Sequence, residues 1–101
     1  MTLEELKDIL KTAGIPVAYG YFEEEQNAPY ILYREAYSNN FSADGIAYCP
    51  ISHVQVELYT NLKSPEVEDK VEDALSSFFW EKSETYLDSE RCYQILYEIE
   101  V

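Results

Sequence analysis

Apolar residues near the N-terminus recur at the spacing of one helix face. This pattern predicts a helix over residues 3–13, and Thr2 and Glu5 can form a capping box in front of it. Gly14 can adopt the left-handed conformation that ends a helix, and Pro16 prevents its continuation. The apolar stripe consists of Leu3, Leu6, Ile9, Leu10 and Ala13. We expect this stripe to be buried against the rest of the protein.

A second apolar stripe predicts a helix in the second half of the chain. Ser64 is a typical capping residue, and Pro65 suits the first turn of a helix. We expect this helix to start after Ser64 and to end near Phe79. Its apolar positions are Val67, Val71, Ala74, Leu75 and Phe78.

Alternating or β-branched segments predict five strands. Residues 52–61 alternate most clearly, with one apolar and one polar face. Residues 30–37 carry apolar side chains on both faces, which indicates a strand that is covered on both sides or completed by a neighbouring subunit. The other predicted strands are 17–22, 83–88 and 92–101.

The segment 38–50 separates two of these strands and is rich in Asn, Ser, Asp and Gly. This composition predicts a long hairpin loop. The loop also contains three large apolar or aromatic residues, which are unusual in a solvated loop: Phe41, Ile46 and Tyr48. We therefore expect these three residues, together with Tyr37 at the end of the preceding strand, to contact another chain.

The order helix, three strands, helix, two strands predicts an α+β fold. We expect one domain over residues 1–101, with an antiparallel or mixed sheet of four to five strands and both helices on one face.

The chain has 101 residues, of which 20 are acidic and 7 basic, so its formal net charge is −13. Binding to DNA or RNA requires a basic face, and the few cations are scattered, so we expect no direct nucleic-acid binding. The same charge suits a passage through which DNA slides without adhering. No apolar run approaches the roughly 20 residues that span a bilayer, and the acidic N-terminus argues against a signal peptide.

The residues that commonly carry chemistry form no convincing site. His53 is the only histidine, and Ser52 beside it lies on the opposite face of the predicted strand, so a catalytic triad is not expected. Glu23, Glu24 and Glu25 lack the spacing of a calcium loop, and we interpret them as a solvated turn. We expect neither an enzyme nor a bound metal or cofactor.

The two cysteines, Cys49 and Cys92, lie far apart in the sequence and form no CxxC motif. We expect both to be reduced thiols, and a disulfide between them is the alternative. The ten tyrosines are the most unusual feature of the composition. They either fill the core and surface of the sheet or form contacts between subunits, and the composition leaves both readings open.

The chain resembles the tail-completion, or tail terminator, proteins of long-tailed bacteriophages and of prophages in Gram-positive bacteria. The resemblance extends over nearly the whole chain and rests on hydrophobic pattern. Its segments are GIPVAYGYF, APYILY, SHVQVELYTN, SPEVEDKVEDALSSFF and SETYLDSERCYQILYEIEV, with VELYT and YEIEV the most similar phrases.

The resemblance implies a structural virion protein made in the cytoplasm of a host bacterium. Six copies would form a ring on the head-proximal end of the tail tube, end tube growth and join the tail to the head. The implied partners are other copies of the chain, the major tail tube protein and the head–tail connector proteins. In such rings the hairpin loop reaches a neighbour, which is the role implied for Phe41, Ile46 and Tyr48.

Two alternatives remain open at this stage. A head-completion or head–tail connector component would also form a ring. An acidic monomeric module that imitates nucleic acid would instead bind a basic partner through a surface dense in carboxylates.

Overall fold

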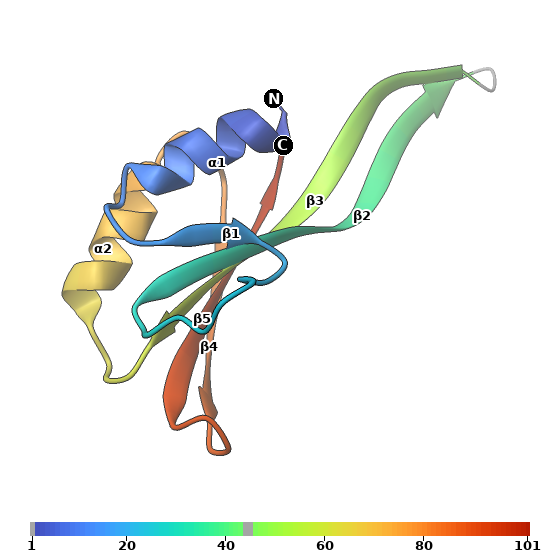
Figure 1. Ribbon diagram of the computed structural model, residues 1–101. Helices are drawn as coiled ribbons and strands as arrows, with labels where there is room; N and C mark the ends of the chain where they lie inside the picture. Colours follow the sequence, from blue (N-terminus) through green and yellow to red (C-terminus); the bar gives the residue numbers. More distant parts are fainter. Residues whose placement is uncertain (1, 44–45) are drawn as a thin grey trace.

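The computed structural model describes residues 2–43 and 46–101, and it describes the side chains of residues 2–36 and 52–101. The fold is α+β, as predicted: two helices and a five-stranded mixed sheet with the strand order β1-β2-β3-β5-β4 (Figure 1). The elements are α1 (Leu3–Lys11), β1 (Val17–Tyr19), β2 (Tyr30–Ala43), β3 (Ile46–Thr60), α2 (Pro65–Ala74), β4 (Glu81–Leu87) and β5 (Cys92–Glu100). Strand β1 runs parallel to β2, and the other neighbouring strands are antiparallel.

Helix α1 begins as the sequence predicts. The Thr2 hydroxyl oxygen accepts a hydrogen bond from the amide of Glu5 at 3.1 Å. The helix ends at Lys11, two residues earlier than predicted, and Gly14 adopts the expected left-handed conformation with φ +80°. The apolar stripe therefore turns Leu6 and Leu10 into the core, where both are fully buried.

Helix α2 is shorter than predicted. It has Ser64 at the capping position and Pro65 in its first turn, but the Ser64 side chain makes no capping hydrogen bond. The helix ends at Ala74 rather than near Phe79, because Leu75 leaves helical geometry and the next residues form turns. Ser76 and Ser77, which have low helix propensity, follow at this point.

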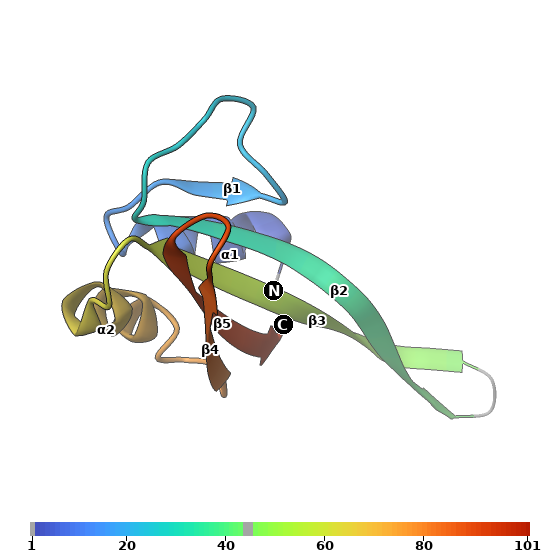
Figure 2. The same cartoon turned by 90° about the horizontal axis from the view of Figure 1, so that it is seen from below.

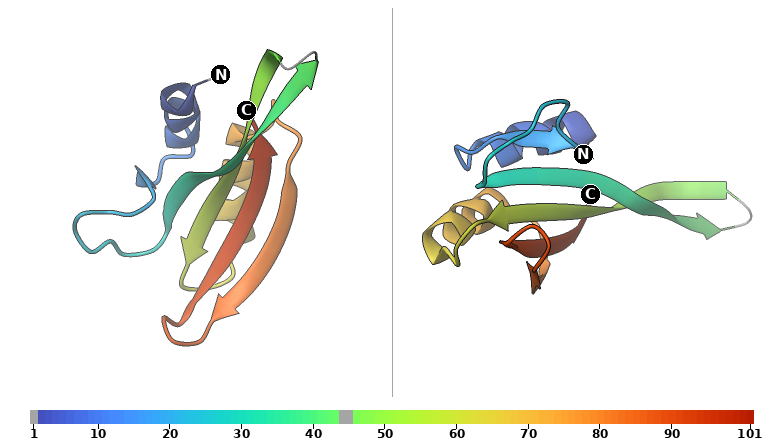
Figure 3. Two further views of the ribbon diagram at one scale, coloured as in Figure 1. Left: turned by 90° about the vertical axis from the view of Figure 1, so that its right-hand side faces the viewer. Right: turned by 60° about the horizontal axis from the view of Figure 1, so that its bottom comes forward.

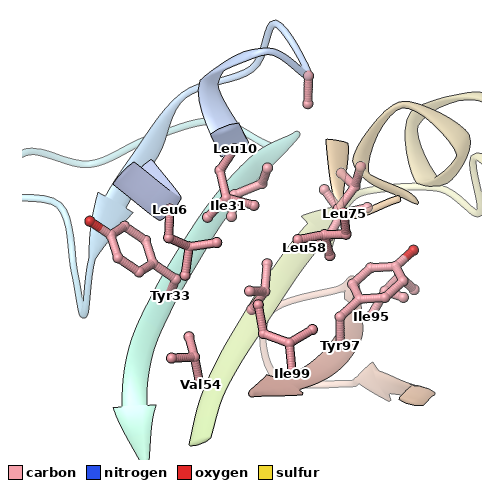
Figure 4. Packing of buried hydrophobic residues seen from close by; sticks show 13 residues of the cluster. Leu6, Leu10, Ile31, Tyr33, Val54, Leu58, Leu75, Ile95, Tyr97 and Ile99 are labelled. Atoms are coloured by element: carbon pink, nitrogen blue, oxygen red, sulfur yellow. The ribbon is translucent and has the colours of Figure 1, made fainter. Parts of the chain in front are cut away.

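The core lies between the two helices and one face of the sheet (Figure 4). Leu6 and Leu10 of α1 lie over β2, and Leu75, the residue that follows α2, lies near Leu58. The apolar positions of the alternating strands are buried: Val54, Val56, Leu58, Ile95, Tyr97 and Ile99. On β2, where the sequence left the buried face open, Ile31 and Tyr33 point into the core. The prediction that both helices cover one face is confirmed.

The segment 38–50 is not the loop that its composition predicts. Strands β2 and β3 stay paired through it as far as Ala43 and Ile46. Backbone pairing between neighbouring strands does not require strongly β-forming side chains, so Asn and Ser continue a ladder that the flanking residues start. The register shifts between Glu35 and Tyr37, and this shift breaks the simple alternation assumed for residues 30–37.

Candidate functional site

Strands β2 and β3 continue beyond the sheet as a two-stranded arm, which comprises residues 39–43 and 46–51 (Figures 2 and 3). The sheet ends where β5 ends: Ser52 and Val101 exchange backbone hydrogen bonds of 3.1 and 3.0 Å. From Ser52 toward the tip of the hairpin, within the described part of the chain, β2 and β3 pair only with each other. The arm thus has two free edges, and neither helix covers it in the views of Figures 2 and 3.

Three of the four predicted contact residues lie on this arm. The backbones of Phe41, Ile46 and Tyr48 belong to its two strands, while Tyr37 lies at its base, paired with His53. The side chains of all four lie outside the described residues. The same holds for Cys49, whereas Cys92 is a free, buried cysteine.

His53 lies on β3 next to the arm. Its Nε2 atom is 3.2 Å from a carboxylate oxygen of Glu98, and its side chain is 15% exposed. A cavity of about 380 Å³ opens here, lined by His53, Phe79, Glu81, Glu98, Ile99 and Glu100. Phe79 lies at the edge of this cavity and is 89% exposed. Sequence reasoning missed this surface ring because it placed Phe79 at the end of a helix.

The face of the sheet opposite the helices carries polar and aromatic side chains. The Tyr30 and Tyr59 rings stack at 4.9 Å between centroids, and Phe22 meets Tyr30 edge-on at 5.5 Å. The segment that joins β1 to β2, residues 20–29, forms a rim beside these rings. The sequence predicted residues 20–22 as the end of a strand and residues 23–29 as a polar turn, but β1 ends at Tyr19. The sequence did not indicate that this segment borders a cavity.

The cavity has a volume of about 580 Å³. Residues from the 20–29 segment, from β2, from the end of β3 and the residue after it, and from the start of β5 and the turn before it surround the cavity. They are Tyr21, Phe22, Glu24, Glu25, Gln26, Asn27, Ala28, Tyr30, Leu32, Tyr59, Asn61, Glu90 and Cys92. Two members of the acidic run, Glu24 and Glu25, are exposed, as expected of a solvated turn, and they also border this cavity.

Hydrogen bonds fix the tyrosine at the floor of this cavity. The Tyr59 hydroxyl donates to Glu57 at 3.1 Å and accepts from the Gln94 amide at 2.9 Å, and the same amide is 2.8 Å from Glu57. Burial raises the pKa of Tyr59 to about 12, against the opposing effect of the Gln94 hydrogen bond. Tyr59 is therefore a neutral donor whose ring position is set by two neighbouring strands.

A buried carboxylate on α2 also escaped sequence reasoning. Glu68 is 2% exposed and forms ion pairs with Lys63 at 2.8 Å and Lys82 at 2.7 Å. Lys82 also contacts Glu72, which accepts a hydrogen bond of 2.7 Å from the Tyr97 hydroxyl. This network joins α2 to β4 and β5, and it belongs to the structural body of the protein. Lys63, Glu68 and Glu72 are close together in the sequence, but nothing there indicated that Lys82 and Tyr97 from later strands would join them.

Comparison with known proteins adds no family to this description. No protein-family model matches the chain, and a search of curated proteins finds none similar in sequence. Across residues 2–43 and 46–101, no helix is long and apolar enough to cross a membrane.

Proposed function

We propose that the protein is a structural component of a phage virion that assembles into a ring. In this proposal, six copies cap the head-proximal end of the tail tube, stop its growth and provide the surface to which the head connector binds. The proposal starts from the resemblance of the sequence segments to tail terminator proteins, and the arm supports it.

The arm is the observation that carries the proposal. A two-stranded hairpin without further cover is marginally stable in water. Here, the strands continue past the end of β5 with both edges free among the described residues. A second protein chain that covers the arm would supply the missing contacts, and in a ring that chain is the next subunit.

A ring needs two different contact surfaces on each subunit, because its subunits meet head to tail. The arm offers one such surface. The free edge of β4 and the exposed Phe79 ring offer candidates for the other. The net charge of −13 agrees with a ring through which DNA passes, since like charges prevent adhesion of the genome.

The test is a mass measurement by sedimentation velocity on the purified protein, alone and with tail tubes built from the major tail protein of the same phage. We expect a species of six times the chain mass of 11.8 kDa, in solution or on tube ends. A protein that remains a monomer of 11.8 kDa and does not bind the tubes would contradict the proposal. A ring that binds isolated heads but not tubes would instead identify a head-completion component.

A further inference from the structure

We infer that the cavity on the open face of the sheet binds an arginine or lysine side chain carried by an extended segment of a partner protein. The inference concerns the cavity beside residues 20–29 and does not require that the subunits form a ring. It rests on the aromatic floor, the charge of the rim and the size of the space.

Aromatic rings line the cavity in a fixed arrangement. Tyr30 stacks on Tyr59, and Phe22 meets Tyr30 edge-on. The hydrogen bonds of Tyr59 with Glu57 and Gln94 hold this group in place. A cation that lies over an aromatic face is attracted by the negative face of the ring, and guanidinium groups do this most often.

The ionisable groups that line the cavity favour a cation. Glu24, Glu25 and Glu90 are acidic, and none of the lining residues is a lysine, arginine or histidine. Burial raises the pKa of Tyr30, and the nearby Cys92, Glu90 and Glu57 raise it further. Glu90 of the rim is therefore close enough to Tyr30 to act on the aromatic floor. A basic side chain would meet both its carboxylate partners and its aromatic contact in the same place.

The size of the cavity favours a protein segment over a small free cation. A volume of about 580 Å³ is several times larger than one guanidinium or ammonium group needs. The remaining space fits the aliphatic stem of the basic side chain and its neighbours in the segment. Tyr21, which is 73% exposed on the rim, provides contact area for such neighbours.

The experiment uses the full chain and a blocked hexapeptide of alternating glycine and arginine as the probe. Amide chemical shifts in NMR spectra, followed at physiological salt, report both the binding site and the affinity. A peptide with citrulline in place of arginine has nearly the same shape without the charge. We expect the arginine peptide to shift amides around Phe22, Tyr30 and Asn61, and the citrulline peptide to bind far more weakly.

Matched variants separate the cavity from the general acidity of the protein. The variant Glu24→Gln, Glu25→Gln, Glu90→Gln should weaken binding about tenfold, since each exposed ion pair contributes modestly. The control Glu66→Gln, Asp69→Asn, Asp73→Asn removes the same charge from the exposed surface of α2 and should leave the affinity within about twofold. Unfolding curves of both variants verify that each remains folded.

Three results with the peptides and variants would overturn the inference, and a fourth concerns a free polyamine. These are equal binding of the citrulline peptide, an equal loss of affinity in the α2 control, or shifts that map to another surface. A further binding measurement uses spermidine in place of the peptide. If spermidine bound as tightly as the peptide and shifted the same amides, the occupant would be a free polyamine and the assignment to a protein segment would be wrong.

Discussion

Strand β3 passes through two different environments. In the half that lies in the sheet, it pairs with β2 on one side and β5 on the other, and Val54, Val56 and Leu58 are fully buried beneath the helices. In the arm half, residues 46–51, β2 is its one partner strand among the residues that the structure describes. The same strand is thus a core element at one end and half of a two-stranded ribbon at the other.

This difference suggests separate roles for the two halves: the sheet half stabilises the fold of the chain, and in the proposed ring the arm half contacts a neighbouring subunit. The sheet half gains stability from apolar burial and from hydrogen bonds on both edges. The arm half has only one partner strand within the described residues, and in the proposed ring a neighbouring subunit would supply the remaining contacts. Substitutions in the sheet half should therefore affect folding, whereas substitutions in the arm should affect assembly.

The largest expected effect comes from removing a core side chain of the sheet half. Leu58→Ala should lower the free energy of unfolding by about 3 kcal/mol, because Leu58 is fully buried and the cavity left behind cannot collapse completely. Urea denaturation measures this change. The control Leu62→Ala alters a side chain that is 79% exposed and should change stability by less than about 0.5 kcal/mol. An equal loss of unfolding free energy in the two variants would contradict the assignment of Leu58 to the core and of Leu62 to the surface.

The next effect concerns the ionic network under α2. Glu68→Gln should lower stability at neutral pH by about 1–3 kcal/mol, since it weakens charge-assisted hydrogen bonds with Lys63 and Lys82. Glu66→Gln, an exposed change on the same helix, is the matched control.

The effect of Glu68 should depend on pH in a defined direction. Burial raises the pKa of Glu68, but the hydrogen bonds from Lys63 and Lys82 outweigh it and leave the pKa below its ordinary value of 4.5. The stabilisation by the carboxylate is therefore complete well above pH 4.5 and is lost as the pH falls through the pKa of the folded state. The stability difference between wild type and Glu68→Gln should shrink on acidification, and a difference that grows would contradict this assignment.

A smaller effect is expected at the start of α1. Thr2→Ala removes the side-chain oxygen that accepts the Glu5 amide hydrogen bond and should cost about 1 kcal/mol of stability. Thr2→Ser retains the oxygen and should restore most of the loss. Thermal unfolding distinguishes these variants, and identical transitions for alanine and serine would mean that the cap contributes nothing.

The helix-covered body was largely predictable from sequence. The two apolar stripes and the alternation of residues 52–61 are local patterns that identify buried faces, and Leu10, Val56 and Val71 are buried as expected. The end of α2 was placed too late, because the apolar spacing continues to Phe78 after the helical backbone has stopped. Local pattern cannot distinguish a helix from the turns that follow it when both direct apolar groups inward.

The arm and the cavity were harder to predict for a common reason. Strand pairing over residues 39–43 and 46–51 depends on two segments that lie opposite each other, and a polar composition conceals it. The cavity joins Glu24 and Phe22 to Tyr59 and Cys92, which come together only after the sheet has formed. Likewise, the buried Glu68 pairs with Lys63, from the connection before α2, and with Lys82 of β4.

The most direct test of the account is the mass of the arm variant Phe41→Ala, Ile46→Ala, Tyr48→Ala, measured by sedimentation velocity with tail tubes present. We expect the variant to unfold within about 0.5 kcal/mol of wild type, because the substitutions lie outside the sheet half. We also expect it to remain a monomer of about 11.8 kDa that does not bind tube ends, under conditions in which wild type forms the ring. A variant that forms rings and caps tubes as wild type does would contradict the claim that the arm drives assembly.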